Sequence, residues 1–290
     1  MSVVRLVELP KISDPRGNLT FLEGLGHVPF DIRRVFWVYD VPSGETRGGH
    51  AYRKSEEFII ALSGSFDVVT DEGKRISKYQ LNRSNFGLYI PPGAWRHLEN
   101  FSTNAVALLV SSTEFDERDY IRDKNSLPPY SVSPEPAAVN EEAKSPISEV
   151  INFGTSSIAD CRELCLPINH RDKGNITVIE KRDTVPFKTE RVYYLYDIPG
   201  GQERGGHAHK ELWQLVIAAS GAFDILIDDG KQKKVVTLNR ANRALLVVPG
   251  IWRELLNFSG GSICLVLSSH KYSEADYYRD YATFVAQKFS

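Results

Sequence analysis

The sequence predicts an all-β protein of two tandem jelly-roll β-barrels, each ending in a short helical segment. Two observations carry this prediction. Short runs of β-branched and aromatic residues recur along the chain, and turn sequences rich in Gly, Pro, Asp and Ser separate them. The same succession of runs then appears a second time. Many short strands at regular turn spacing are typical of closed or double-sheet β architectures.

The repeat becomes visible when the chain is aligned with itself. Residues 47–50 and 204–207 both read RGGH, which sets an offset of 157 residues. At this offset the two halves match without a gap over more than a hundred positions. A solenoid unit is about 20 to 50 residues long, so a period of this length indicates whole domains. We predict a first domain over residues 1–124, a Pro-rich linker over 125–148 and a second domain over 149–290.

Each copy contains the same series of expected strands. In the first copy they cover residues 34–39, 58–62, 66–70, 87–90 and 105–111. In the second copy they cover residues 191–196, 215–219, 223–227, 244–248 and 262–268. Only the segments around residues 115–123 and 272–287 have a helical pattern.

Composition and charge exclude several classes of protein. The 290 residues carry 35 basic and 37 acidic side chains, so no field of the whole chain attracts nucleic acid or an anionic membrane. Three cysteines without a CxxC pair argue against a disulfide framework. No window approaches 18 uncharged apolar residues, and the N-terminus lacks a secretory signal. We expect a cytoplasmic protein with no nucleic-acid or membrane partner.

The sequence RGGHAHK of the second copy places two histidines one residue apart. In a strand, alternate residues share a face, so His207 and His209 are expected to point into one cavity while Ala208 points away. Two imidazoles on one wall suggest a metal site or acid/base chemistry. The alternative is a pair of half-buried barrel histidines without a chemical role.

The spacing around these histidines resembles the motifs of the cupin barrel. In the first motif, Gln214 stands where that superfamily has a carboxylate ligand, and in the second motif Arg253 replaces a histidine. A guanidinium stays protonated and has no lone pair to give to a cation. We therefore predict two cupin domains in which no metal is bound.

A narrower resemblance is to the nucleotide-sugar 3,4-ketoisomerases. It rests on RGGHAHK, the following Gln, DDG, LLVVPGIW and the closing SSHKYSEADYYRDY, and it covers nearly all of each copy. The resemblance implies a homodimeric jelly-roll cupin without a cofactor, which converts dTDP-4-dehydro-6-deoxyglucose into its 3-keto isomer. It places the chain in deoxy-amino-sugar biosynthesis, for lipopolysaccharide or S-layer glycans.

The resemblance also implies roles for residues of the second copy. His209 is expected to be the base at C3, and His207 is expected to relay protons between the oxygens or at C4. Histidine suits this role because its unperturbed pKa is about 6.5. Tyr193 is expected to donate to the enediolate, with Tyr194 and Tyr196 as rivals for the inward face.

Four further side chains of the second copy are expected to bind substrate. Arg204, Arg253 and Lys173 are cationic candidates for the diphosphate or an oxyanion. Gln214 is expected to contact a sugar hydroxyl, or else to be a satisfied barrel amide. Lys173 and Arg253 also occupy positions that bear on the configuration at C4, which the sequence leaves open.

The first copy departs from this pattern. Tyr52 replaces the second histidine, Phe36 replaces Tyr193, and a phenol with a pKa of about 10 is a poor base at neutral pH. We expect a vestigial site there, with the first copy serving as a pseudo-subunit within the chain. Whether it binds a nucleotide sugar, and whether the chain forms a homodimer, stay open. The candidate residues of this vestigial site are Arg47, His50, Tyr52 and Arg96.

Two other functions are consistent with the sequence. The chain could be a non-catalytic cupin that binds a dTDP-linked keto sugar, in which case it has no need for two imidazoles. It could also be a 3,5-epimerase, which shares the barrel and the substrate class. A metal-dependent dioxygenase is disfavoured because both copies carry arginine at a ligand position.

Overall fold

The structure is a computed structural model that describes residues 3–73, 75–127, 151–180 and 184–290. From residue 128 onward, the expected linker lies outside the described residues. The chain divides into two compact units, which exchange segments relative to the sequence repeat. Unit 1 contains β1, β4 to β12, β14 and β15, whereas unit 2 contains β2, β3, β13, β16 to β24 and α1. Each unit is described by itself.

Unit 1 is a two-layered β structure, and its described residues form a seven-stranded and a five-stranded sheet. In spatial order, the larger sheet contains β1 (Arg5–Glu8), β9 (Phe86–Ile90), β6 (Glu57–Ser63), β11 (Val106–Ser111), β4 (Arg34–Tyr39), β15 (Gly174–Ile179) and β14 (Ile168–Arg171). The smaller sheet contains β12 (Tyr120–Ile121), β5 (Arg47–Tyr52), β10 (Trp95–Glu99), β7 (Phe66–Asp71) and β8 (Ile76–Leu81).

Unit 2 repeats this arrangement within its described residues. Its larger sheet contains β13 (Arg162–Cys165), β21 (Arg243–Val247), β18 (Gln214–Ser220), β23 (Ile263–Ser268), β16 (Arg191–Tyr196), β3 (Gly17–Glu23) and β2 (Lys11–Asp14). Its smaller sheet contains β20 (Lys233–Leu238), β19 (Phe223–Asp228), β22 (Trp252–Leu256), β17 (Arg204–His209) and β24 (Tyr277–Tyr278). Each unit is thus a jelly roll of the cupin type, as the sequence predicts.

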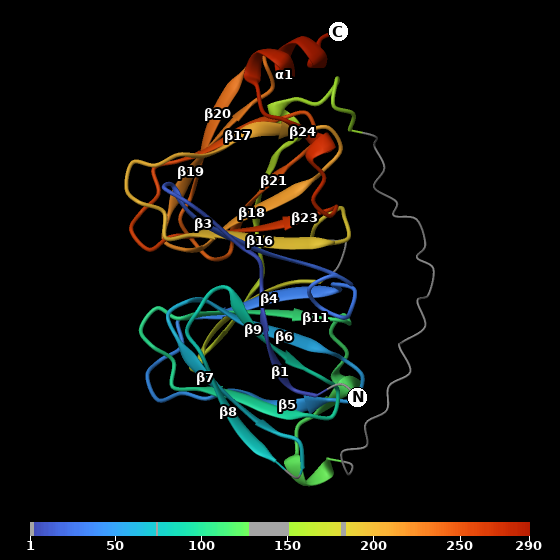
Figure 1. The fold of residues 1–290 in the computed structure, drawn as a ribbon, viewed down its shortest axis with the longest axis vertical. Coiled ribbons are helices and arrows are strands. Elements are labelled where there is room, and N and C mark those ends of the chain that lie inside the picture. Colours follow the sequence, from blue (N-terminus) through green and yellow to red (C-terminus); the bar gives the residue numbers. More distant parts are fainter. Residues whose placement is uncertain (1–2, 74, 128–150, 181–183) are drawn as a thin grey trace. The chain divides into compact units, whose positions relative to one another are not determined.

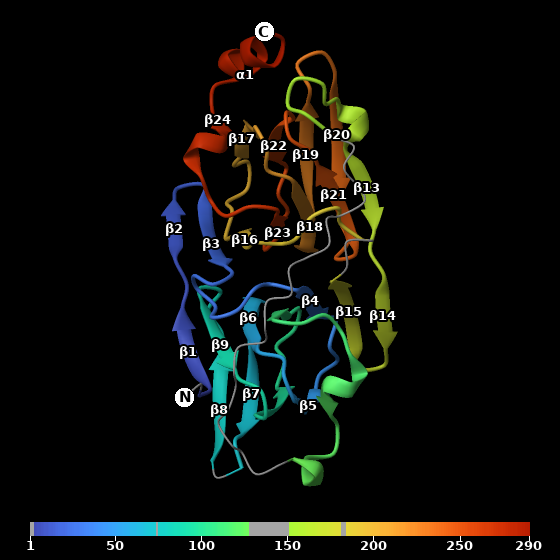
Figure 2. The same cartoon turned by 90° about the vertical axis from the view of Figure 1, so that its right-hand side faces the viewer.

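The exchanged segments are the hairpins β2–β3 and β14–β15. β3 pairs antiparallel with β16 of unit 2, and Figure 1 shows the blue β3 alongside it. In the same way β15 pairs with β4 of unit 1, as Figure 2 shows. Thr20 of β3 is buried and its hydroxyl lies 3.0 Å from the Tyr196 hydroxyl. The first repeat therefore supplies an integral part of the sheet of unit 2.

A glycine permits the tight turn of the hairpin in unit 2. Gly17 has a φ of +114°, a conformation that side chains disfavour. A Cβ at this position would lie 3.0 Å from the backbone oxygens of Tyr196 and Asp197. The GN sequence of each repeat therefore marks the point where its hairpin meets the neighbouring strand.

The described helical segments are short and confined to connections and termini. The segments with a helical sequence pattern are only partly helical, because Tyr120–Ile121 and Tyr277–Tyr278 extend to pair with β5 and β17. No helix in the described part of the chain is long and apolar enough to cross a membrane. The helical segments are η1 (Glu117–Asp119), η2 (Lys124–Ser126), η3 (Ile158–Asp160), η4 (Glu274–Asp276) and α1 (Tyr281–Lys288).

The core of each unit fills the space between its two sheets. In unit 2 this cluster includes Tyr193, Ile225 and Val266, and Leu19 and Phe21 of the exchanged β3 pack against it. The side chains of alternate residues line this interior, which is the geometry that brings functional groups of β16, β17 and β18 together.

Candidate active site

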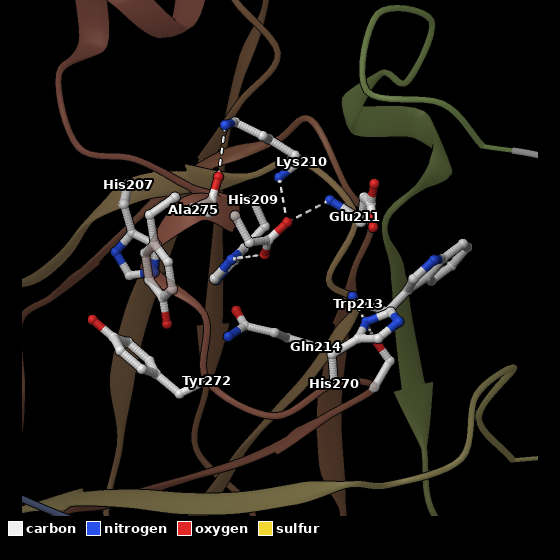
Figure 3. Close-up of polar contacts among 12 residues, drawn as sticks. His207, His209, Lys210, Glu211, Trp213, Gln214, His270, Tyr272 and Ala275 are labelled. Carbon is white, nitrogen blue, oxygen red and sulfur yellow. Dashed lines mark hydrogen bonds and ion pairs between the residues drawn. The ribbon is translucent and has the colours of Figure 1, made fainter.

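Two histidines of β17 lie on the same face of the strand in unit 2. The ring centroids of His207 and His209 are 5.0 Å apart, and Ala208 between them packs instead against Trp252 and Phe284. This is the alternation that the sequence predicts. Figure 3 shows both imidazoles facing the same space as the side chains of Gln214 and Tyr272.

A local irregularity of β17 sets the position of these histidines. The register between β17 and β22 shifts between Gly205 and His207, so that His207 pairs with Arg253. Gly205 has a φ of +90°, and a Cβ there would lie 2.9 Å from the Arg253 backbone oxygen. The two glycines of the RGGH sequence therefore allow the bulge that turns the histidines inward.

His209 is held at both ring nitrogens. Its Nδ1 lies 2.7 Å from Oδ2 of Asp276, and its Nε2 lies 3.4 Å from a terminal nitrogen of Arg253. An ionised carboxylate only accepts hydrogen bonds and a guanidinium only donates them. Nδ1 of His209 must therefore carry the proton, and Nε2 must present its lone pair.

Asp276 is a site residue that the residue-by-residue sequence analysis did not single out. It lies in η4, directly before β24, and β24 pairs with β17 so that His209 is opposite Tyr277. The backbone N–H groups of Lys210 and Glu211 also donate to Oδ1 of Asp276, over 3.1 and 2.8 Å. Burial raises the pKa of Asp276, while these donors favour its ionised form. The signal in the sequence was the Asp-Tyr pair of the closing motif.

Both histidines are neutral at physiological pH. Burial, reinforced by the charge of Arg253, holds the pKa of His209 well below its usual value of 6.5. The same two causes lower the pKa of His207. Burial therefore favours the neutral form, in which one ring nitrogen of each histidine has a lone pair, and it disfavours the protonated form.

His207 differs from His209 because no side chain among the described residues hydrogen-bonds its ring nitrogens. Neither of its ring nitrogens has a hydrogen-bond partner among the described residues, and both nitrogens are shielded from solvent. Its ring lies 4.8 Å from the ring of Tyr277. Buried polar atoms without partners are uncommon in native proteins, so His207 is a group that a ligand would satisfy.

The phenol of Tyr193 completes the centre of the site. Its oxygen accepts hydrogen bonds from Gln214 Nε2 over 2.9 Å and from Arg253 over 3.5 Å, which leaves its own hydrogen free to donate. Burial raises the pKa of Tyr193 above its usual value, so the phenol keeps this hydrogen. Of its two rivals, Tyr196 contacts the Thr20 hydroxyl instead, and Tyr194 is fully buried with its ring against Tyr196.

Arg191 is a second residue that the sequence analysis missed. Its guanidinium lies over the rings of Tyr193 and Tyr272, 4.8 and 5.5 Å from their centroids, and donates to the Tyr277 hydroxyl over 3.4 Å. Arg191 is 5% exposed, and no carboxylate pairs with it in the part of the chain that the structure describes. Arg253 is equally without a carboxylate there, because the neutral Gln214 takes the place of an acidic residue.

The cation Arg204 is paired with a residue of the exchanged hairpin. One of its terminal nitrogens lies 2.8 and 2.9 Å from the two oxygens of Asp14 in unit 2. Hydrogen bonds from Arg16, together with the charge of Arg204, lower the pKa of Asp14 to about 2. Asp14 therefore stays ionised and holds Arg204 at the start of β17.

Lys173 lies elsewhere than the sequence analysis expects. The exchange of hairpins places it in unit 1, where Nζ is 3.2 Å from Oε2 of Glu45. In unit 2 the matching position of the hairpin is filled by Arg16, which hydrogen-bonds Asp14. In the sequence, each hairpin belongs to its own repeat. In the structure, it pairs with a strand of the unit that the other repeat mainly forms.

An arginine occupies the position of a cupin metal ligand in unit 2. In the described ranges, no group of three or more His, Cys, Asp or Glu side chains is placed to hold a metal ion. At the position of the missing ligand, the guanidinium of Arg253 faces His209 and can only donate.

A known protein family matches both repeats of the chain. Residues 2–130 and 159–288 both match the FdtA family, described as WxcM-like, C-terminal. Together the two segments cover most of the chain. The chain belongs to the FdtA family.

Individual relatives each match less than half of the chain. The TDP-4-oxo-6-deoxy-alpha-D-glucose-3,4-oxoisomerase of Aneurinibacillus thermoaerophilus is 35% identical over 126 residues, which are 43% of this chain and 91% of that protein. The structure of a 3,4-ketoisomerase from Helicobacter canadensis is 37% identical and covers 45% of this chain and 98% of its own, with a TM-score of 0.44. QdtA, a sugar 3,4-ketoisomerase from Thermoanaerobacterium thermosaccharolyticum in complex with TDP, is 30% identical over 46% of this chain and 96% of its own, with a TM-score of 0.45.

The second FdtA-type site, in unit 1, is built differently. Glu57 replaces Gln214, and its carboxylate accepts two hydrogen bonds from Arg96 over 2.7 and 2.8 Å. Both partners are almost fully buried. The hydroxyl of Tyr52, at the position of His209, points to Glu57 and Tyr120 over 3.4 and 3.3 Å. The guanidinium of Arg253 in unit 2 faces no carboxylate among the described residues, whereas its counterpart Arg96 in unit 1 is neutralised by Glu57.

The carboxylate that matches Asp276 is also redirected in unit 1. Asp119 accepts from the backbone N–H groups of Lys54 and Ser55 over 2.6 and 3.1 Å, and from the Ser55 hydroxyl. Unit 2 has Leu212 where unit 1 has Ser55, so Asp276 keeps an oxygen for His209. In unit 1 a tyrosine therefore stands at the position of His209, and the carboxylate that matches Asp276 binds backbone N–H groups and Ser55.

Proposed function

We propose that unit 2 isomerises a TDP-linked 4-keto-6-deoxy sugar to the 3-keto sugar. The observation that carries this proposal is the arrangement of His209. Its Nδ1 is hydrogen-bonded to Asp276, and its Nε2 presents a lone pair beside the Arg253 guanidinium that can accept a proton. The names of the relatives supply the substrate class, a TDP-linked 4-keto-6-deoxyglucose. The names of these relatives, 3,4-oxoisomerase and 3,4-ketoisomerase, also support the reaction type.

The first step is removal of the proton at C3. The C4 ketone acidifies this proton, and Nε2 of His209 accepts it. Charge then develops on the C4 oxygen, where the free O–H of Tyr193 and the uncompensated guanidinium of Arg253 can stabilise it. Asp276 stabilises the imidazolium that forms on His209, as the acid partner of a catalytic histidine does.

The second step moves protons between the two oxygens. A neutral imidazole has one donating and one accepting nitrogen, and both nitrogens of His207 lack a partner among the described residues. His207 can therefore take the proton from the C3 hydroxyl and give one to the C4 oxygen. The proton on His209 exchanges with solvent, and His209 then delivers a solvent-derived proton to C4. C3 is oxidised and C4 is reduced in the same molecule, so the reaction consumes no external oxidant or reductant.

The test is proton NMR of TDP-4-keto-6-deoxyglucose incubated with the protein in deuterium oxide. The expected result is a 3-keto product with deuterium at C4, and its loss in the His209→Asn variant. The matched control is Tyr52→Phe, which changes the equivalent position of unit 1 and is expected to keep the turnover of the parent.

Two outcomes would overturn the proposal. Deuterium at C5 with no 3-keto product would identify a 3,5-epimerase. Binding of the sugar without any exchange of hydrogen would identify a non-catalytic nucleotide-sugar cupin. Wild-type turnover in His209→Asn would leave the isomerase but remove His209 from its mechanism.

A further inference from the structure

The two units differ at two central positions of the site and have similar residues around them. Two of the groups assigned to the reaction in unit 2 are replaced in unit 1, where Phe36 stands in place of Tyr193 and Tyr52 in place of His209. The residues around these two positions are of the same or a similar type in both units. The matching pairs in units 1 and 2 are Arg34 and Arg191, His50 and His207, Tyr120 and Tyr277, Phe115 and Tyr272, and Arg47 and Arg204.

Arg34 is a buried cation without a carboxylate of its own. It is 3% exposed, and within the described residues it donates only to neutral oxygens, the hydroxyls of Tyr120, Tyr52 and Ser111, over 3.2 to 3.4 Å. Its Nε has no partner among the described residues. The charge of Glu57 reaches Arg34, but that carboxylate is bound by Arg96. Because an unpaired buried charge is costly, an anionic ligand is the group that this arrangement lacks.

His50 presents a second unsatisfied group at the same place. It is 7% exposed, and its Nε2 has no partner in the described part of the chain. Its ring lies 4.8 Å from the rings of both Tyr52 and Tyr120, whose hydroxyls accept from Arg34. A buried ring nitrogen and a buried guanidinium thus converge on the same pair of phenols.

An exposed aromatic ring lies beside these groups. Phe115 is 50% exposed, its ring centroid is 5.3 Å from that of Tyr120, and the Arg34 guanidinium lies 6.0 Å from it. An open aromatic face next to a cation suits a nucleobase or a sugar ring, since every base has a face that can stack.

A further cationic feature of unit 1 is a change of charge sign in the exchanged hairpin. Where unit 2 has Asp14 against Arg204, unit 1 has Arg171, whose charge acts on the buried Arg47. Lys173 and Glu45 lie beside them as an ion pair. Three cations and one carboxylate leave this group with an excess of positive charge, which favours phosphate.

We infer that unit 1 binds a nucleoside diphosphate, alone or as the nucleotide sugar, and does not turn it over. The chain then has two ligand sites, one with a base and one without. The choice of a nucleoside diphosphate rests on the proposed function of unit 2. The presence of an anion site in unit 1 rests on the buried Arg34 and His50 and on the charges around Arg47.

The test is isothermal titration calorimetry of the full-length His209→Asn protein with TDP, so that turnover plays no part. We expect two sites per chain. Arg34→Gln and Arg47→Gln should each weaken one site at least tenfold and leave the other unchanged. The matched variants Arg191→Gln and Arg204→Gln should instead weaken the other site. Thymidine without phosphates should bind neither site detectably.

A variant that avoids the interior guards against misfolding. Arg171→Gln with Lys173→Gln changes two exposed side chains, and we expect unit 1 to bind TDP three- to tenfold more weakly at low salt. A single site that responds to Arg191→Gln and not to Arg34→Gln would overturn the inference. Two sites in a protein without isomerase activity would contradict the proposed function but keep the inference, so the two failures are distinguishable.

Discussion

The Asp276→Asn variant is the sharpest test of the proposed chemistry. Asp276→Asn keeps the size of the side chain and removes the negative charge that faces Nδ1 of His209 at 2.7 Å. While His209 is neutral, the loss costs one charge-assisted hydrogen bond. When His209 holds the C3 proton, the loss also removes the counter-charge of an imidazolium. The variant should therefore lower kcat much more than it weakens substrate binding.

The magnitude follows from the separation of the charges. A nitrogen–oxygen distance of 2.7 Å places the centres of imidazolium and carboxylate about 4 Å apart. Two unit charges at that separation near a protein surface interact with about 4 kcal/mol. Since each 1.4 kcal/mol is about a factor of ten in rate, kcat should fall about 10³-fold.

The assay is the initial rate of 3-keto sugar formation over a range of substrate concentrations, with Asp119→Asn as the matched control. Asp119 holds the same position in unit 1 and also binds two backbone N–H groups, but it contacts no imidazole. Its variant should keep kcat within twofold of the parent. A kcat for Asp276→Asn within tenfold of the parent would refute the reasoning, and so would a loss confined to KM.

Three further predictions follow from the contacts in the two units. Because the pKa of His209 is lowered, the base stays unprotonated under mild acid, and kcat/KM should not decline until below pH 6.5; an acid limb centred above 6.5 would contradict this. Glu57→Gln leaves the buried Arg96 without its carboxylate and should destabilise unit 1 by about 3–5 kcal/mol, measured by denaturant unfolding; a change below about 1 kcal/mol would mean that the pair is solvated. Tyr52→His in the His209→Asn background should not restore turnover, because Ser55 and the backbone engage the carboxylate of Asp119; recovery of a tenth of the parent rate would show that a histidine alone suffices.

The sequence alone was sufficient to predict the duplicated all-β fold and the inward face of β17. Both depend on local patterns, since strand alternation puts His207 and His209 on one side whatever surrounds them. The departures of the first copy at Phe36 and Tyr52 were equally readable from an alignment of the two halves. The expected roles of these residues in catalysis stay predictions.

Only the tertiary structure decided which residues surround that face. The hairpins of the two repeats have similar sequences, so no local signal tells whether β3 pairs with β4 or with β16. The pairing seen here puts Asp14 beside Arg204 and takes Lys173 to the other unit. Asp276 likewise reaches His209 from 67 positions away through the pairing of β24 with β17. Contacts of this kind depend on the packing of whole sheets, and the spacing of residues along the chain does not encode them.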